Sequence, residues 1–161
     1  MYKIGQGIDF HQLADDLPLI IGTIKIPFYK GSDGHSDGDV LLHSITDAIL
    51  GSINEGDIGK HFPSSDNKWK GADSAVFLKF SIDLLFKKQF KIINIDSTVI
   101  LQKPKISPYI EDMKKNISKI IQCNDISIKS TTTDFLGFIG KSKGICAIST
   151  VLIGKETQLC Q

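Results

Sequence analysis

The sequence predicts a single α/β (α+β) domain, with a mixed four-stranded sheet, helices on one face of the sheet and a small hairpin. Two observations indicate this class. Runs rich in β-branched and aromatic residues alternate with longer segments whose apolar residues recur at helical spacing. Such elements pack as helices stacked on a sheet around one core. The chain has 161 residues and shows no internal repeat or linker, so residues 1–161 are expected to form one domain.

Five strand-like runs follow one another along the chain. The second run, residues 19–26, carries Gly22 and Thr23 at its centre and is typical of a hairpin. The other four runs are expected to form the sheet: residues 3–8, 93–101, 126–131 and 144–153.

Three helices are expected between these strands. Asp39 is a suitable N-cap for the first, because apolar residues recur at helical spacing over residues 41–49. Residues 73–86 open with a capping residue and form the second helix. The third opens with Ser107 as its N-cap and Pro108 at the first helical position, and its buried stripe comprises Ile110, Met113, Ile117, Ile120 and Ile121.

Three of the four histidines lie among closely spaced carboxylates. Asp9 and His11 directly follow the first strand-like run; residues two apart on a strand point to the same face, so these two side chains can converge on one ion. His43 lies about one turn into the first helix. Two imidazoles and a carboxylate suit zinc and related divalent ions, and three protein ligands leave one coordination position open. We therefore predict a metal site at Asp9, His11 and His43; the alternative is three hydrogen-bonded or surface residues.

Two acidic residues flank His43 on its own helix. Asp39 and Asp47 lie four residues before and after it, on the same helix face. A metal-binding histidine usually donates its other ring N–H to a nearby acceptor. We hypothesise that one of these two carboxylates is that acceptor.

Two further segments are candidates for binding groups. Residues 49–66 form a long loop rich in Gly, Asp and Ser beside the predicted metal site; a merely solvated loop is the alternative. Residues 130–133 are four consecutive hydroxyl side chains, followed by Asp134. Hydroxyls can donate to phosphate oxygens and a carboxylate can hold a hard cation such as Mg²⁺. A threonine-rich strand end is the simpler alternative.

Composition excludes several classes of protein. The 19 basic and 18 acidic residues give a net charge of +1, without the basic arm of a nucleic-acid-binding protein. No apolar run is long enough for a membrane span and no signal peptide is evident. Cys123, Cys146 and Cys160 are odd in number and lack zinc-ribbon spacing, so we expect reduced core or tail residues and a cytoplasmic, bacterial protein. A processed plastid-type protein is the alternative.

Six runs, which include HSDGDVLLH and TTTDFLGF, resemble the 2-C-methyl-D-erythritol 2,4-cyclodiphosphate synthase family. They follow the family's order over about residues 3–153, and the two quoted runs are the most specific. Asp134 stands where the family usually has glutamate. The runs are residues 5–11, 35–43, 56–60, 62–63, 70–74 and 131–138.

The resemblance implies a phosphorus–oxygen lyase of the non-mevalonate (MEP) route to isoprenoid precursors. Such enzymes convert 4-diphosphocytidyl-2-C-methyl-D-erythritol 2-phosphate to the cyclic diphosphate and release CMP. The 2-phosphate of the substrate attacks its own β-phosphorus, so the protein supplies alignment and charge neutralisation. The resemblance also implies a homotrimer, with each active site between neighbouring subunits.

The resemblance assigns roles to residues of this chain. It implies that Asp9, His11 and His43 bind Zn²⁺, that Asp134 binds Mg²⁺ or Mn²⁺, and that His35 and Thr132 are catalytic. Residues 101–107 correspond to a cytidine pocket. The implied substrate-binding residues are Asp9, His11, His35, Ser36, Asp57, Gly59, Phe62, Ser65, Asp66, Leu101, Lys105, Ile106, Thr131, Thr132, Thr133, Asp134, Phe138 and Lys141.

Two alternatives remain at this stage. Two histidines and one carboxylate also form the facial triad of non-haem iron oxygenases, although there the usual order is His-x-Asp followed by a distant His. A non-catalytic, metal-stabilised trimer that binds nucleotides or prenyl diphosphates would share the same motifs. Lys141 and Lys143 stand where the family often has Arg and Glu, which makes prenyl diphosphate binding at the trimer axis doubtful.

Overall fold

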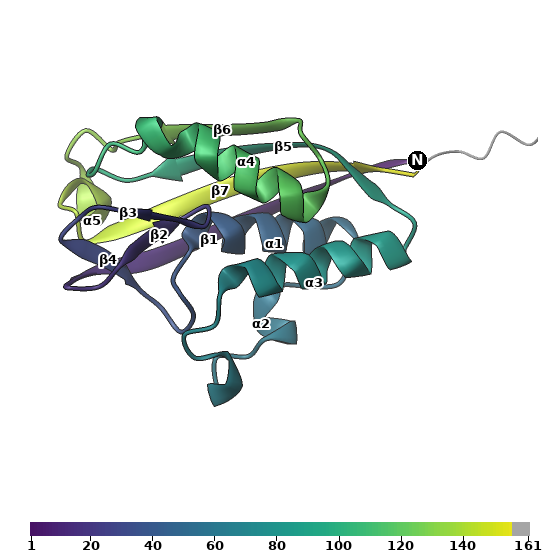
Figure 1. Cartoon of the computed structure of the whole chain (residues 1–161), viewed down its shortest axis with the longest axis horizontal. Coiled ribbons are helices and arrows are strands. Elements are labelled where there is room, and N and C mark those ends of the chain that lie inside the picture. Colours follow the sequence, from purple (N-terminus) through teal and green to yellow (C-terminus); the bar gives the residue numbers. More distant parts are fainter. Residues whose placement is uncertain (156–161) are drawn as a thin grey trace, which may run out of the picture.

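The computed structural model describes residues 1–155 and contains one five-stranded sheet. Its strand order is β4-β1-β7-β5-β6, and neighbours are antiparallel except β5 and β6, which are parallel. The predicted mixed sheet is therefore confirmed (Figure 1). The strands are β1 (Tyr2–Asp15), β4 (Lys30–Asp33), β5 (Lys91–Ile100), β6 (Ile126–Thr131) and β7 (Gly144–Gly154).

The predicted number of four strands is wrong, because β4 adds a fifth at one edge. It pairs with the last four residues of β1. Its Lys-Gly-Ser-Asp sequence has little β-propensity, so the open edge of the long strand β1 decides its conformation. The predicted hairpin is confirmed: β2 (Leu19–Ile21) and β3 (Ile24–Ile26) pair across Gly22 and Thr23, which both have positive φ.

Three long helices cover one face of the sheet, as predicted (Figure 1). They are α1 (Val40–Ser52), α3 (Ser74–Lys87) and α4 (Ile110–Ile121), and their buried side chains join those of the sheet in one core. Four short helices lie in the connections: α2 (Ile58–His61), α5 (Gly137–Gly140), η1 (Asn67–Trp69) and η2 (Ser107–Tyr109).

The start of the third long helix differs from the prediction. Ser107 and Pro108 belong to the 3-10 turn η2, which leads into α4, and Ser107 caps neither element. The proline favours the helical φ of this turn, but the serine is already inside it. The predicted stripe does face the core, with three members buried and the last two partly buried: Met113, Ile117, Ile121, Ile110 and Ile120.

Two glycines of β1 allow α1 to pack very closely on the sheet. A Cβ atom on Gly5 would lie 1.8 Å from the carbonyl oxygen of Ala48, and one on Gly7 would lie 2.1 Å from that of Ser44. No larger residue fits at either position without a shift of the helix. This close approach sets the distance between β1 and the side chain of His43.

The opposite face of the sheet carries exposed apolar side chains. In β1, Tyr2, Ile4, Ile8 and Phe10 alternate with the residues that face α1, and all four are exposed. Large exposed apolar side chains gathered on one face of a sheet indicate a surface that interacts with another molecule.

Two of the three cysteines lie within the described residues. Cys146 is buried and Cys123 is partly buried, both as free thiols, whereas Cys160 lies outside the described residues. Among the helices of residues 1–155, none has the length and apolar character that crossing a membrane requires.

Candidate metal centre and its pockets

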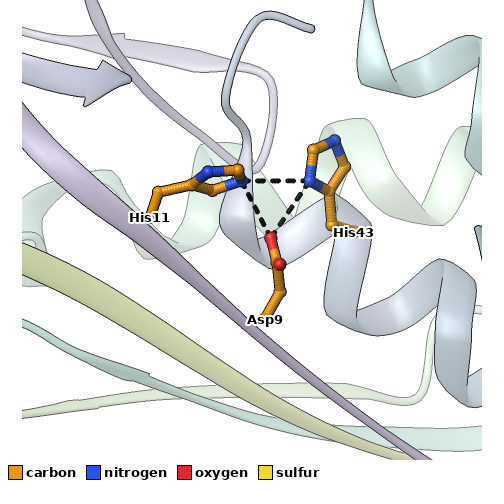
Figure 2. Close-up of side chains that lie close together, drawn as sticks. All are labelled: Asp9, His11 and His43. Atoms are coloured by element: carbon orange, nitrogen blue, oxygen red, sulfur yellow. Dashed lines mark hydrogen bonds and ion pairs between the residues drawn. The ribbon is translucent and has the colours of Figure 1, made fainter. Parts of the chain in front are cut away.

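Asp9, His11 and His43 converge as their spacing predicts (Figure 2). Asp9 and His11 point from the same face of β1, and His43 reaches them from α1. The Oδ2 atom of Asp9 lies 2.9 Å from Nε2 of His11 and 3.0 Å from Nδ1 of His43, and the two nitrogens are 3.2 Å apart. The three residues thus form a metal-binding site; we call them the triad.

The three donor atoms form a triangle that fits one face of the coordination tetrahedron of a zinc ion. Zinc bonds of about 2.0–2.1 Å place neighbouring ligand atoms roughly 3.3 Å apart. The separations in the triad are 2.9, 3.0 and 3.2 Å, slightly shorter than this value. Two imidazoles and one carboxylate suit zinc and related divalent ions, and three ligands leave a position for an outside group.

The histidines keep the carboxylate of the triad ionised. Burial by itself would raise the pKa of Asp9, but the hydrogen bonds and charges of His11 and His43 lower it to about 2. Burial by itself would lower the pKa of His11, but contact with the Asp9 carboxylate outweighs it and raises that pKa. An ionised carboxylate is the form that binds a metal ion.

The outer nitrogen of His43 contacts two serine hydroxyls. Its Nε2 atom lies 3.0 Å from Oγ of Ser36 and 2.9 Å from Oγ of Ser74. The hypothesis that Asp39 or Asp47 accepts a hydrogen bond from this nitrogen is therefore wrong.

Both aspartates bind backbone N–H groups instead. Asp39 caps α1, as predicted, and also accepts hydrogen bonds from the two turn residues of the β2–β3 hairpin. Asp47 accepts a hydrogen bond of 2.7 Å from the N–H of Ile58, at the start of α2. Helical spacing places a side chain on a face but does not decide which of several donors it binds.

A pocket of about 180 Å³ adjoins the triad. Besides the histidines of the triad, four residues that the resemblance assigns to the substrate or to catalysis lie in its wall: His35, Ser36, Gly59 and Phe62. The prediction that residues 49–66 form one loop is wrong in part, because residues 49–52 end α1 and residues 58–61 form α2. Four residues of this segment do border the site, namely Ile58, Gly59, Phe62 and Ser64. The full lining is His11, His35, Ser36, His43, Ile58, Gly59, Phe62, Ser64, Trp69 and Phe77.

Three other expected substrate-binding residues lie outside this lining. Asp57 accepts a hydrogen bond of 2.9 Å from the N–H of Lys60 and so caps α2. Asp66 accepts one of 3.0 Å from the N–H of Lys68 and caps η1. Ser65 is exposed beside them.

Aromatic residues that the sequence analysis did not single out form part of the pocket wall. The ring of Phe62 has its centroid 4.8 Å from that of Trp69 and 4.5 Å from that of Phe77. Trp69 is the chain's single tryptophan, and its position shortly after Phe62 was the signal that could have identified it. Phe77 carries no such signal, because an apolar residue in α3 is equally suited to the core.

A second pocket, of about 270 Å³, lies where the parallel strands β5 and β6 end. The N–H of Leu101 donates to the carbonyl of Thr131 at 3.0 Å and joins the two strand ends. Five implied substrate-binding residues line this pocket, namely Leu101, Lys105, Ile106, Thr131 and Thr132, together with Gln102, Pro104, Ser107 and Ser130.

The loop after β6 carries the remaining predicted residues. The hydroxyl of Thr132 lies 3.3 Å from the carboxylate of Asp134, and both side chains are exposed. Thr133 donates its hydroxyl hydrogen to the carbonyl of Leu136. Asp134 has a φ of 50°, in the left-handed region.

Phe138 and Lys141 follow at α5. The ring of Phe138 packs against Phe10, with centroids 6.4 Å apart, beside a hollow of about 590 Å³. Lys143 lines that hollow, whereas Lys141 does not.

One chain does not bring the triad and the loop after β6 together. The pockets that contain His35 and Thr132 share no lining residue. In the sheet, β1 and β6 are separated by β7 and β5, which amounts to three strand spacings or about 14 Å. The two predicted catalytic residues therefore belong to different pockets of a single chain.

The sequence model of one protein family matches residues 2–154 of the chain. The chain belongs to the YgbB family. A relative from Bacillus subtilis (strain 168), named 2-C-methyl-D-erythritol 2,4-cyclodiphosphate synthase, is 52% identical over 157 residues, which is 96% of this chain and 99% of that protein. The resemblance found in the sequence is thereby confirmed.

Solved structures share this YgbB-family fold. The bifunctional IspDF from Campylobacter jejuni matches with a TM-score of 0.91 and 39% identity; the match covers 95% of this chain but 42% of that longer one. IspF from Plasmodium falciparum, solved as a CDP complex, matches with a TM-score of 0.85 and 37% identity over 97% of both chains. These similarities support the predicted single-domain α/β class.

Proposed function

We propose that this YgbB-family chain is a 2-C-methyl-D-erythritol 2,4-cyclodiphosphate synthase, the activity for which its relative is named. It converts 4-diphosphocytidyl-2-C-methyl-D-erythritol 2-phosphate to the cyclic diphosphate and releases CMP. The observation that carries the proposal is 52% identity over almost the whole length of both chains. The triad beside a pocket supports it independently, because diphosphate chemistry commonly uses a bound metal ion.

The proposed reaction requires alignment and no protein nucleophile. An oxygen of the 2-phosphate forms a bond to the β-phosphorus, and the bond from that phosphorus to the bridging α-phosphate oxygen breaks, so CMP leaves with the bonding electrons. His35 and Ser36 lie in the wall of the pocket next to the triad. From there they donate hydrogen bonds to phosphate oxygens and stabilise the charge that develops in the transition state.

Asp9, His11 and His43 bind Zn²⁺ in this proposal. A zinc ion held there supplies Lewis-acid polarisation of the β-phosphate. The donor atoms, their separations of 2.9 to 3.2 Å and the ionised Asp9 carboxylate support this choice.

The second pocket receives the nucleotide. Its lining includes Lys105 and several hydroxyl side chains, which suit the phosphates and hydroxyls of a cytidine nucleotide. Asp134 binds Mg²⁺ or Mn²⁺ there, with the exposed Thr132 hydroxyl beside it as a phosphate donor. Thr133 completes this side, and Phe138 and Lys141 lie near the terminal phosphates. The methylerythritol unit is bordered by Asp57, Gly59, Phe62, Ser65 and Asp66.

A homotrimer would bring these two halves together. The exposed apolar face of β1 and the exposed residues Phe135, Leu136 and Phe138 provide surface for such an assembly. In it, the loop after β6 of one subunit would lie against the triad of its neighbour. The separation of His35 and Thr132 within one chain supports this arrangement.

Co-expression of two inactive variants tests the shared site. His43→Ala removes the triad half and Asp134→Ala removes the loop half. If sites form between subunits, an intact site needs the triad of one subunit and the loop of its neighbour. Each of these is intact in about half of the subunits, so mixed trimers should regain about a quarter of the wild-type sites. If each site lies within one chain, CMP release stays at the level of the single variants. Analytical ultracentrifugation of the wild type checks the trimer directly.

CMP release with and without a chelator tests the function. The enzyme releases CMP from the cytidylyl substrate, loses this activity with chelator and regains it with Zn²⁺. Nucleotide binding without CMP release would instead support the non-catalytic trimer, and X-ray fluorescence that detects iron would support the oxygenase. We place the chain in the cytoplasm, with residues 1–161 as a single catalytic domain.

A further inference from the structure

His43 is buried, and its two ring nitrogens face different partners. Only 8% of its surface is exposed. Nδ1 points to the triad, 3.0 Å from Asp9, while Nε2 lies 2.9 Å from the hydroxyl of Ser74 and 3.0 Å from that of Ser36. A metal ion bound at Nδ1 requires the lone pair of that nitrogen, so the single ring proton must sit on Nε2.

Ser74 is placed to accept this proton. It is fully buried and is the first residue of α3. Its hydroxyl donates to Oδ1 of Asp37 in a short hydrogen bond, and its backbone N–H donates to Oδ2 of the same carboxylate at 3.1 Å. Because the hydroxyl hydrogen is directed at Asp37, the oxygen of Ser74 faces His43 as an acceptor.

Asp37 is itself held in place by the backbone. Its Oδ1 also accepts a hydrogen bond of 3.1 Å from the N–H of Asp39. Its N–H donates to the carbonyl of Ala72 at 3.0 Å, which ties the segment before α1 to the segment before α3. Asp37, which accepts the hydroxyl hydrogen of Ser74, is thus anchored between the starts of α1 and α3.

We propose that Ser74 and Asp37 are positioning residues that hold His43 in the Nε2–H form, with the Nδ1 lone pair directed at the metal ion. The chain of hydrogen bonds runs from Nε2 of His43 to Ser74 and from Ser74 to Asp37. Such partners of metal-binding histidines raise metal affinity by orienting the ring. The inference rests on the proposed metal site at the triad.

This arrangement gives Ser36 a different task. Ser36 lines the pocket beside the triad, whereas Ser74 does not. With a proton on Nε2, that nitrogen cannot accept the hydroxyl hydrogen of Ser36. This hydrogen is then directed either to the pocket or to the oxygen of Ser74, which lies 3.4 Å away. Ser74 therefore acts on metal binding, and Ser36 acts on the substrate.

Zinc affinity, measured by competition with a chromophoric chelator, tests the proposal. Ser74→Ala should weaken zinc binding by about 10- to 100-fold, and Asp37→Asn by a smaller factor because one oxygen acceptor remains. The d–d absorption of bound Co²⁺ should change in both. Ser36→Ala should keep zinc affinity within about threefold and raise KM. The matched control is Ser81→Ala, a buried serine of the same helix whose hydroxyl donates to the carbonyl of Leu78.

The outcomes separate this proposal from the proposed function. Circular dichroism and thermal unfolding without metal establish that each variant is folded; if Ser74→Ala does not fold, Asp37→Asn decides. Stoichiometric zinc in the wild type together with unchanged affinity in the folded positioning variants would overturn the positioning role alone. A wild type that binds no zinc would overturn both proposals. If Ser36→Ala loses as much zinc affinity as Ser74→Ala, the proposal is wrong in choosing Ser74 over Ser36 as the acceptor of the Nε2 proton.

Discussion

The pocket around the triad and the loop at residues 132–134 differ in how firmly contacts within one chain hold their side chains. Around the triad, His43, Ser74 and Asp39 are buried and each is held by at least two hydrogen bonds. In the loop, Thr132 and Asp134 are exposed and hydrogen bond mainly to each other. The chain preorganises the surroundings of the triad, whereas the conformation of the loop at residues 132–134 depends on what packs against it.

The largest effect should follow from His43→Ala. Loss of one of three ligands should reduce CMP release by about 1,000-fold or more while the apo protein stays folded. Coupled assays of CMP together with zinc analysis check this. The control is His61→Ala, because His61 does not line the triad pocket; its Nε2 atom lies 2.9 Å from the carbonyl of Glu55 and its ring packs near Phe62 and Phe80. Equal losses in the two variants would contradict the special role of His43.

A slightly smaller effect should follow from Gly7→Ala. The added Cβ would meet the carbonyl oxygen of Ser44 at 2.1 Å and push α1 away from β1. We expect a loss of about 3 kcal/mol in the free energy of unfolding, with weaker zinc binding. Denaturant unfolding measures the first quantity. Gly51→Ala is the matched control in α1, because its Cβ would meet nothing closer than 4.0 Å and should be neutral or stabilising.

Asp134→Ala should separate activity from stability. We expect about a 100-fold loss of CMP release, near 2.7 kcal/mol, and a higher requirement for Mg²⁺. Because the side chain is exposed, the loss of unfolding free energy should stay within about 1 kcal/mol, and it should come from placing alanine at a left-handed backbone position. Asp134→Glu restores a carboxylate and should retain most activity. A large loss of stability in Asp134→Ala would show that the loop is built as firmly as the triad pocket.

The smallest effect should come from the titration of Asp39. Burial raises its pKa to about 6, although hydrogen bonds from backbone N–H groups act to lower it. Because the folded pKa lies above the unfolded value of 3.8, the stabilisation from the bound proton is complete below about pH 4 and is lost as the pH rises through 6.

Comparison with Asp39→Asn isolates this contribution. From pH 4 to pH 7.5, the wild type should lose about 2 kcal/mol of unfolding free energy relative to the variant, because asparagine does not titrate. Any difference in unfolding free energy that does not change with pH reflects the second side-chain oxygen, which accepts a backbone hydrogen bond in Asp39 and is missing in asparagine. A difference independent of pH would mean that the backbone donors outweigh the cost of burying the charge.

Local patterns were sufficient for much of the fold. Asp39 caps α1 as its position before an apolar periodic segment predicts, and Gly22-Thr23 forms the hairpin turn. The edge strand β4 was not predictable, because its residues have no strand preference and pair only with the far end of β1. The prediction that Ser107 is the N-cap of the third helix is wrong, because the chain already forms the 3-10 turn η2 at Ser107, before α4 begins.

By itself, the sequence determined the ligand set of the metal site. A two-residue spacing on a strand puts Asp9 and His11 on one face, and helical periodicity places His43 one turn into α1. Only the tertiary structure decided that Ser74, rather than Asp39 or Asp47, faces the outer nitrogen of His43. The physical reason is that spacing defines a direction along one element, whereas a hydrogen bond between elements depends on how closely they pack.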